Sequence, residues 1–195
     1  MEIKHYENIE YTDLVISEEK ISNKYFFDCI FKNCKINNCT LENSKFLNCQ
    51  FDNCTIVTLK SDNSDIKNAQ INKCNLIGIN WSEMSNQRYG HTKAIDKMTH
   101  SFLKYNSFFE VSLRKVDCSY NTLNECTFET CDLVLANFKE CDFQGTVINN
   151  SDLRKADFRD ARNYYIDLKN NQLKDAQFSF PEVSNLLYSL DIKID

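Results

Sequence analysis

The sequence predicts an all-β solenoid, in which the chain winds into a stack of short coils around one apolar core. Two repeating patterns in the 195-residue chain predict this fold. A large apolar residue recurs at every fifth position, and a small residue precedes most of these large residues by two positions. The chain also holds 24 Asn but only 3 Gly and 1 Pro. Since Gly and Pro are the usual turn formers, a loop-rich fold of ordinary turns fits this composition badly.

The large apolar residues form two blocks. The first runs from Ile16 to Trp81, and the second runs in a new phase from Leu103 to Phe178. Of the 30 positions in these registers, 27 are Leu, Ile, Phe or Trp. A period of five matches neither a helix nor a straight strand, so the backbone must turn a corner in every unit. The three of these 30 positions that are not Leu, Ile, Phe or Trp are Ser61, Cys118 and Asn163.

The cysteines follow the same period. Nine of the ten lie on the small-residue register, and only Cys118 takes a large-residue position. Spacings such as C-x2-C, which hold zinc, are absent. A free thiol packs as a small apolar residue, so we expect core cysteines and no metal, cofactor or disulfide.

Asn is expected to form the corners of the first block. It tolerates left-handed backbone angles and bonds to nearby backbone groups, so it turns the chain without Gly. Eight Asn lie two positions after a large residue, namely Asn23, Asn33, Asn38, Asn43, Asn48, Asn53, Asn63 and Asn68.

Individual units resemble a known family. Ala156-Asp157-Phe158-Arg159-Asp160 and Cys131-Asp132-Leu133-Val134-Leu135 are similar to the A(D/N)LXX units of the pentapeptide repeat family. The resemblance covers residues 12–180 and implies a right-handed quadrilateral β-helix with a short C-terminal helix. Within the family, the layout resembles the group of Qnr quinolone-resistance proteins and the microcin immunity protein.

The resemblance also implies a division of the chain. Residues 1–180 would form the β-helix, with coils at about 12–83 and 101–180. A loop would project at about 84–100, where the phase changes and the repeat is lost. In Qnr-like proteins such a loop contacts the partner. The residues that would do so here are Arg88, Tyr89, His91 and Lys93.

The tail, residues 181–195, is expected to contain a helix and a short strand. Pro181 suits a first helical turn, and apolar residues follow at helical spacing from Val183 to Leu190. A solenoid needs its open end covered, and in the relatives that the chain resembles the tail also joins two protomers. We expect a homodimer, with capping alone as the alternative. The expected interface residues are Leu186, Leu187, Leu190, Ile192 and Ile194.

Acidic residues gather in the second block. Residues 117–152 carry seven acids against Lys139 alone, within a chain of net charge −5. On four-sided coils this stretch would cover about 9 Å of rod, over which B-DNA carries about five charges. The acids would then either mimic a duplex or merely solvate the rod. They are Asp117, Glu125, Glu129, Asp132, Glu140, Asp142 and Asp152.

Function is expected to reside on the surface. The chain has no G-x-S-x-G, H-E-x-x-H or phosphate-binding Gly motif, so we expect no enzyme. No secretory or membrane segment is visible, which favours a cytoplasmic protein that binds neither membrane nor nucleic acid directly. Resemblance implies a DNA mimic that binds the type II topoisomerases DNA gyrase or topoisomerase IV and protects them against quinolones or toxins. The alternative is an interaction scaffold with a different partner, which the net charge of +3 over residues 20–82 favours.

Overall fold

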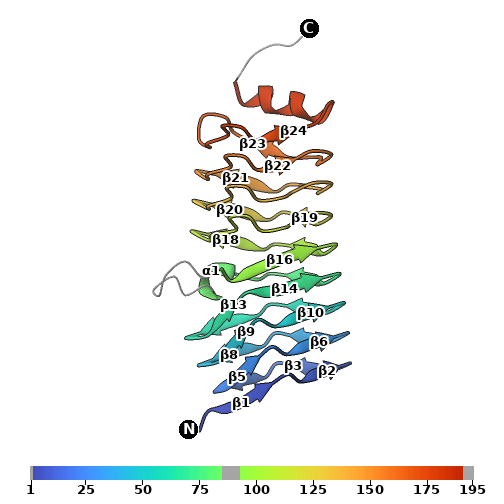
Figure 1. Ribbon diagram of the computed structural model, residues 1–195, viewed down its shortest axis with the longest axis vertical. Helices are drawn as coiled ribbons and strands as arrows, with labels where there is room; N and C mark the ends of the chain where they lie inside the picture. The colour runs from blue at the N-terminus through green and yellow to red at the C-terminus, as the bar shows by residue number, and fades with distance from the viewer. Residues whose placement is uncertain (1, 85–92, 191–195) are drawn as a thin grey trace.

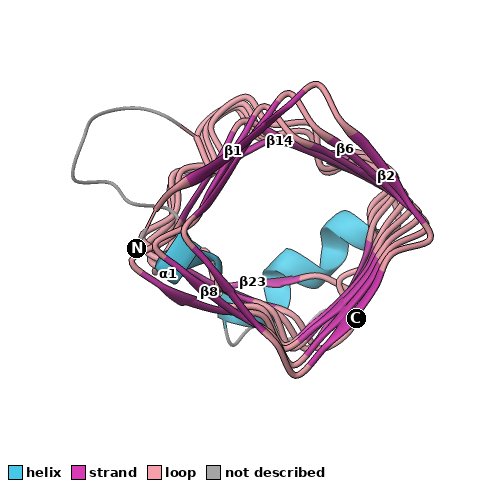
Figure 2. Ribbon diagram, turned by 90° about the horizontal axis from the view of Figure 1, so that it is seen from below, coloured by secondary structure: helices cyan, strands magenta, loops and turns pink. Residues whose placement is uncertain are grey.

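A computed structural model describes residues 2–84 and 93–190 and shows a straight, four-sided rod (Figures 1 and 2). Short parallel strands form its sides, and each strand lies beside the strand one coil later. Phe31, for example, pairs with Phe51. The predicted fold class, a quadrilateral β-helix with a short C-terminal helix, is confirmed. None of the described helices is long and apolar enough to cross a membrane.

Four faces make up the rod, numbered here in the order in which the chain meets them. Face 1 holds β1 (Lys4–Glu7), β5 (Lys24–Phe27), β9 (Lys45–Leu47) and β13 (Asp65–Lys67). Face 2 holds β2 (Glu10–Thr12), β6 (Ile30–Lys32), β10 (Gln50–Asp52), β14 (Ala69–Asn72), β16 (Ile95–Thr99), β22 (Asp157–Phe158) and β24 (Gln177–Phe178).

The other two faces carry the remaining strands. Face 3 holds β3 (Val15–Ser17), β7 (Lys35–Asn37), β11 (Thr55–Val57), β15 (Asn75–Ile77), β17 (Phe102–Lys104) and β19 (Thr122–Asn124). Face 4 holds β4 (Lys20–Ser22), β8 (Thr40–Glu42), β12 (Lys60–Asp62), the helix α1 (Trp81–Met84), β18 (Ser107–Phe109), β20 (Thr127–Glu129), β21 (Val147–Asn149) and β23 (Tyr165–Ile166). The 3-10 helix η2 (Glu182–Leu190) follows the last coil.

Left-handed residues make the corners between the faces. Twenty-eight described residues other than Gly have positive φ, almost all at five-residue intervals. The eight predicted corner Asn are among them, with φ between 46° and 55°. Several stack on one another, since Asn53 Nδ2 donates to Asn33 Oδ1 at 2.8 Å and Asn68 Nδ2 donates to Asn48 Oδ1 at 3.0 Å. In the second block Tyr, Lys, Glu and Leu take the same position, which the sequence reasoning did not anticipate.

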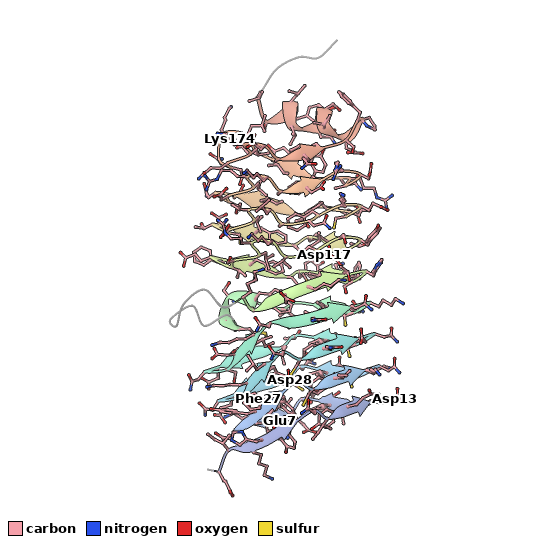
Figure 3. The ribbon with its side chains drawn as sticks, viewed as in Figure 1. Glu7, Asp13, Phe27, Asp28, Asp117 and Lys174 are labelled. Carbon is pink, nitrogen blue, oxygen red and sulfur yellow. The ribbon has the colours of Figure 1, made fainter. Side chains whose placement is uncertain are left out.

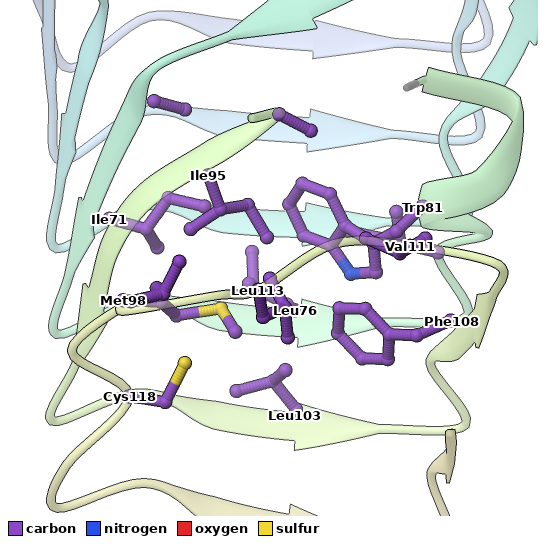
Figure 4. Packing of buried hydrophobic residues seen from close by; sticks show 14 of the residues in the cluster. Ile71, Leu76, Trp81, Ile95, Met98, Leu103, Phe108, Val111, Leu113 and Cys118 are labelled. Atoms are coloured by element: carbon purple, nitrogen blue, oxygen red, sulfur yellow. The ribbon is translucent and has the colours of Figure 1, made fainter. Parts of the chain in front are cut away.

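The large residues fill the rod as stacked columns. Phe26 lies 4.7 Å from Phe46, and Phe108 lies 4.5 Å from Phe128, measured between ring centroids. Trp81 of α1 stacks on Phe108 at 5.9 Å and so continues the column through the phase change (Figure 4). Because every coil places its apolar residues against those of its neighbours, the core runs without a break along the rod.

The small-residue register has a second role besides packing. All ten cysteines are free and buried, as predicted for core residues. Most of these thiols also donate to a backbone carbonyl of the preceding coil, as Cys131 Sγ does to Phe108 O at 3.2 Å. Ser44 and Asn171 make the same contact with Ile21 O and Ile148 O. A weak donor at this register therefore satisfies a carbonyl that Ala would leave to other partners.

Two departures from the expected registers are clear. Asn163 is exposed and left-handed, and the core positions there fall to Tyr164 and Ile166, because Ile148 pairs with a residue 18 positions later instead of 20. The strands also begin at Lys4, before residue 12, and β16 occupies the end of the segment 84–100 that was expected to be a loop.

Candidate protein-interaction surfaces

The seven acids expected to form one binding face lie on four faces. Strand register places Asp132 beside Asp152 on face 1 and Asp117 beside Asn137 on face 2. Asp142 lies on face 3 beside Thr122, and Glu129 ends β20 on face 4. The remaining two, Glu125 and Glu140, take left-handed corner positions after faces 3 and 2. The rod therefore brings only Asp132 and Asp152 together as stacked neighbours.

Basic residues neutralise four of the seven. Lys97 pairs with Asp117 at 3.8 Å, Arg114 with Asp132 at 2.8 Å, Arg162 with Asp142 at 3.0 Å, and Arg154 with Asp152 at 2.6 Å. The hydrogen bond from Arg154 holds the pKa of Asp152 below its ordinary value, so this carboxylate stays ionised together with its partner. These pairs leave little net negative charge where they lie.

A different acidic surface lies on face 4. Between α1 and β23 this face presents Glu83, Glu110, Glu129 and Asp167, and no Lys or Arg lies within α1, β18, β20, β21 or β23. Phe109 and Tyr165 are 51% and 55% exposed on the same face. We call these six residues the acidic-aromatic face. Of them, the sequence reasoning selected only Glu129, because it counted charge along the chain and not by register.

The acidic-aromatic face is built around α1. Asn80 Oδ1 accepts from the backbone N–H of Ser82 at 3.1 Å and caps the helix, and Asn80 Nδ2 donates to Glu83 at 3.0 Å. Ser82 Oγ then accepts from the backbone N–H of Phe109 at 2.9 Å. These contacts fix the exposed ring of Phe109 beside the point where the chain enters the segment between the two blocks.

The predicted partner-binding loop falls mainly outside the described residues. Arg88, Tyr89 and His91 lie there, so their role stays a prediction. Lys93 is described and half-buried, and its carbonyl accepts from the backbone N–H of Asn68 at 2.9 Å.

The C-terminal helix covers the end of the rod (Figure 1). Leu186 is buried in the core, whereas Leu187 and Leu190 are each 36% exposed. Ser189 Oγ accepts from the backbone N–H of Leu168 at 3.2 Å and so ties the helix to the last coil. Ile192 and Ile194 lie outside the described residues. Of the five residues expected at a dimer interface, Leu186 therefore serves the cap, and Leu187 and Leu190 remain available on the surface.

The described residues show no arrangement that suggests metal or nucleophilic chemistry. No group of three or more His, Cys, Asp or Glu among them is arranged to hold a metal ion. Burial raises the pKa of the Cys49 thiol and of the Cys141 thiol to about 12 each, so these two thiols carry little reactive thiolate at neutral pH.

Comparison with known proteins identifies the repeats. Residues 112–150 and 122–160 match the family model described as pentapeptide repeats, with eight copies. The predicted resemblance is thereby confirmed for this part of the chain. No curated protein sequence matches the chain.

Two solved structures share the fold along nearly the whole rod. Full-length QnrB1, described as a plasmid-mediated fluoroquinolone resistance protein, is 20% identical with a TM-score of 0.56, covering 96% of this chain and 100% of that chain. A trypsin-treated variant of QnrB1 is 19% identical with a TM-score of 0.54, covering 100% of both chains. At these identities the likeness establishes the fold.

Proposed function

We propose that this rod of pentapeptide-repeat coils is a non-catalytic, Qnr-like protein that binds a type II topoisomerase, DNA gyrase or topoisomerase IV, and protects it against quinolones or toxins. The observation that carries the proposal is the match of the rod to QnrB1 over 96–100% of both chains. Fluoroquinolones poison type II topoisomerases, and QnrB1 is a plasmid-mediated fluoroquinolone resistance protein.

The acidic-aromatic face is the surface we assign to the topoisomerase. From α1 to β23 it crosses four coil steps, or about 19 Å, and presents four acids. B-DNA of that length carries about eleven charges. The face therefore has the sign of a duplex but well under half its charge density. Phe109 and Tyr165 would supply the apolar contact that DNA lacks, since exposed aromatic residues are frequent anchors of protein interfaces.

A supercoiling assay tests the proposal. Purified protein is added to DNA gyrase, relaxed plasmid and ATP, with and without a fluoroquinolone. We expect micromolar protein either to restore supercoiling in the presence of the drug or to inhibit supercoiling in its absence. No effect in either arm, with gyrase and with topoisomerase IV, would contradict the proposal.

A scaffold for another partner is the second candidate. The observation that favours it is the distribution of the seven acids over four faces, four of them in ion pairs, which gives no continuous duplex-like stripe. A purified-protein pulldown that yields a saturable partner but no topoisomerase would support this alternative.

A further inference from the structure

Face 1 carries a column of basic residues that points away from the core. The outward position that Lys67 takes in β13 is held in the following coils by Lys93, Arg114, Val134, Arg154 and Lys174. Asn68 N–H donates to Lys93 O just as Asn48 N–H donates to Lys67 O, both at 2.9 Å, which places Lys93 one coil after Lys67. The strand pairing of Ser112, Asp132, Asp152 and Gln172 aligns the rest.

The column spans five coil steps, or about 24 Å. Five of its six residues are basic, and Lys174 projects from the last part of the rod (Figure 3). Within the described residues the other faces carry no comparable run of cations. Charges of both signs occur on face 2, face 3 has Lys35, Lys104 and Arg162 with Asp142, and acids prevail on face 4. The sequence reveals this column only when the five-residue unit is combined with the four units of each coil, because the two together determine which residues stack.

Beside the column lies a second row at the next corner, made of Lys115, Leu135, Lys155 and Asp175. All four have positive φ, between 59° and 63°, so their side chains project outward from the corner. Leu135 is 43% exposed and lies one coil from each of the two lysines. The two rows enclose an open groove of about 400 Å³ lined by Arg114, Val134, Leu135, Arg154, Lys155, Lys174 and Asp175.

The two lysines that line this groove, Lys155 and Lys174, and Lys115, which follows Arg114 in the chain, are available to a ligand. The two arginines already pair with Asp132 and Asp152. Within the described residues, Lys115, Lys155 and Lys174 form no ion pair at 4 Å or less. The groove therefore offers uncommitted positive charge around an apolar centre formed by Val134 and Leu135.

We propose that the groove on face 1 binds an acidic, amphipathic helix of a protein partner. Lys115 and Lys155 lie two coils apart, or about 9.6 Å, with Leu135 midway. In a helix, residues i and i+7 are about 10.5 Å apart along the axis, with i+4 on the same side between them. A helix laid along the rod with Glu at i and i+7 and an apolar residue at i+4 thus matches all three side chains.

Nucleic acid fits the same groove less well. Arg114 and Arg154, whose guanidinium groups would suit phosphates, are already paired with Asp132 and Asp152. A phosphate backbone also has no apolar group to cover Leu135. The chain as a whole carries a net charge of −5, which opposes the approach of a polyanion at long range. This contact is independent of the topoisomerase surface, because it uses face 1 and not face 4.

Fluorescence anisotropy with a designed probe tests the proposal. The probe is a labelled, Ala-based helical peptide with Glu at i and i+7 and Leu at i+4 on one face. We expect it to bind the full chain saturably, and we expect K115E/K155E to weaken binding about tenfold. Leu135→Asn, which suits the left-handed corner, should also weaken binding. The matched control K35E/K73E makes the same charge change at exposed sites away from face 1 and should alter affinity less than twofold, on the order of measurement error.

Four outcomes would overturn the proposal. The first two are the absence of saturable peptide binding and an equal loss in K35E/K73E. The third is tighter binding of a short DNA duplex than of the peptide, with the same dependence on Lys115 and Lys155. The fourth is a Gln-for-Glu peptide that binds as well as the Glu peptide. Circular dichroism of each variant confirms that the rod remains folded, and the supercoiling assay, which reports on face 4, separates failure here from failure of the proposed function.

Discussion

Leu103 of β17 lies directly beside Leu76 of β15 in the sheet of face 3, although 27 residues separate them. Elsewhere on this face the spacing is 20, as between Ile56 and Leu76. Six of the seven additional residues fall between α1 and β16, and the seventh is a bulge within β16, where Ala69 pairs with Ile95 but Gln70 pairs with Lys97. Strand pairing continues on both sides of the inserted segment. The insertion is therefore tolerated without loss of the core column, and we expect it to serve recognition instead of folding.

Alanine substitution in the inserted segment tests that division of roles. We expect replacement of Arg88, Tyr89, His91 and Lys93 by Ala to shift the melting temperature by only about 1–2 °C, because surface changes cost little. If the segment contacts a topoisomerase, the same variant should lose most of its effect in the supercoiling assay. A variant that melts unchanged and keeps full activity would show that the segment makes no such contact.

Removing charge from the acidic-aromatic face should weaken the topoisomerase effect. We expect E83Q/E110Q/E129Q to require roughly tenfold more protein, and we expect binding of the unaltered chain to weaken as salt rises. The measurement is the protein concentration at half-maximal effect. The matched control D13N/E18Q/D160N removes three exposed acids from corners on other faces. Equal losses in both triple variants would indicate a general charge effect and count against the assignment of face 4.

Substitutions in the C-terminal helix should distinguish a role in capping the rod from a role in dimerisation. Leu187→Asp with Leu190→Asp should convert a dimer to a monomer, because both side chains are on the surface. The same pair should leave the melting temperature of the rod almost unchanged. Leu186→Ala should instead lower the free energy of unfolding by about 2–3 kcal/mol, since it leaves a cavity in the core.

Light scattering on a sizing column reads the oligomeric state of each variant. If the unaltered chain is already a monomer at micromolar concentration, the dimer prediction is wrong and the helix is a cap alone.

Much of the fold was predictable because one rule repeats. A large residue, a small residue and a left-handed corner recur in each unit, so Phe31, Cys34 and Asn33 could be placed from spacing alone. The prediction failed where the five-residue repeat is interrupted. Asn163 continues the five-residue count but lies on the surface, because the chain reaches face 4 two residues early and Tyr164 and Ile166 fill the core. The 20-residue spacing returns on face 1, where Asp152 pairs with Gln172.

The candidate surface was harder to predict for a physical reason. Charge counted along the chain mixes four faces, since successive units point in directions that differ by a quarter of a coil. Asp132 and Glu140 are eight residues apart yet lie on face 1 and at the corner after face 2. Only the register between coils shows that Glu83 and Glu110 share a face, or that Arg114 and Arg154 share a column.

Buried thiols should make the rod sensitive to alkali. Burial raises the pKa of Cys126 and of Cys131 from 9.0 to about 11 each. Between pH 9 and 11 the folded chain therefore keeps these protons while the unfolded chain releases them. Stability is thus unaffected below about pH 9 and falls as pH rises above it, by about 1.4 kcal/mol for each thiol and pH unit.

The double variant C126A/C131A isolates that effect. It should be less stable than the unaltered chain at pH 7, because it loses packing and two thiol hydrogen bonds. Its stability should nevertheless fall less steeply between pH 9 and 11. Urea unfolding at a series of pH values provides the measurement, and parallel curves for the two proteins would rule out thiol ionisation as the cause.

One corner of face 3 is strained, and a substitution there should raise the stability of the protein. Thr58 closes the corner after β11 with φ of 51°, whereas Asn38 and Gly78 hold the same corner in the adjoining coils with φ of 52° and 64°. A β-branched residue is disfavoured at positive φ, by about 1–3 kcal/mol, and Asn much less so. We expect Thr58→Asn to raise the free energy of unfolding by about 1 kcal/mol and the melting temperature by about 2–4 °C. The reverse change in the neighbouring coil, Asn38→Thr, should lower both by a similar amount. Suppose that Thr58→Asn leaves the free energy of unfolding unchanged while Asn38→Thr lowers it. The threonine hydroxyl must then compensate for the backbone strain at Thr58, and the preference of a residue for positive φ does not by itself determine its effect on stability at these corners.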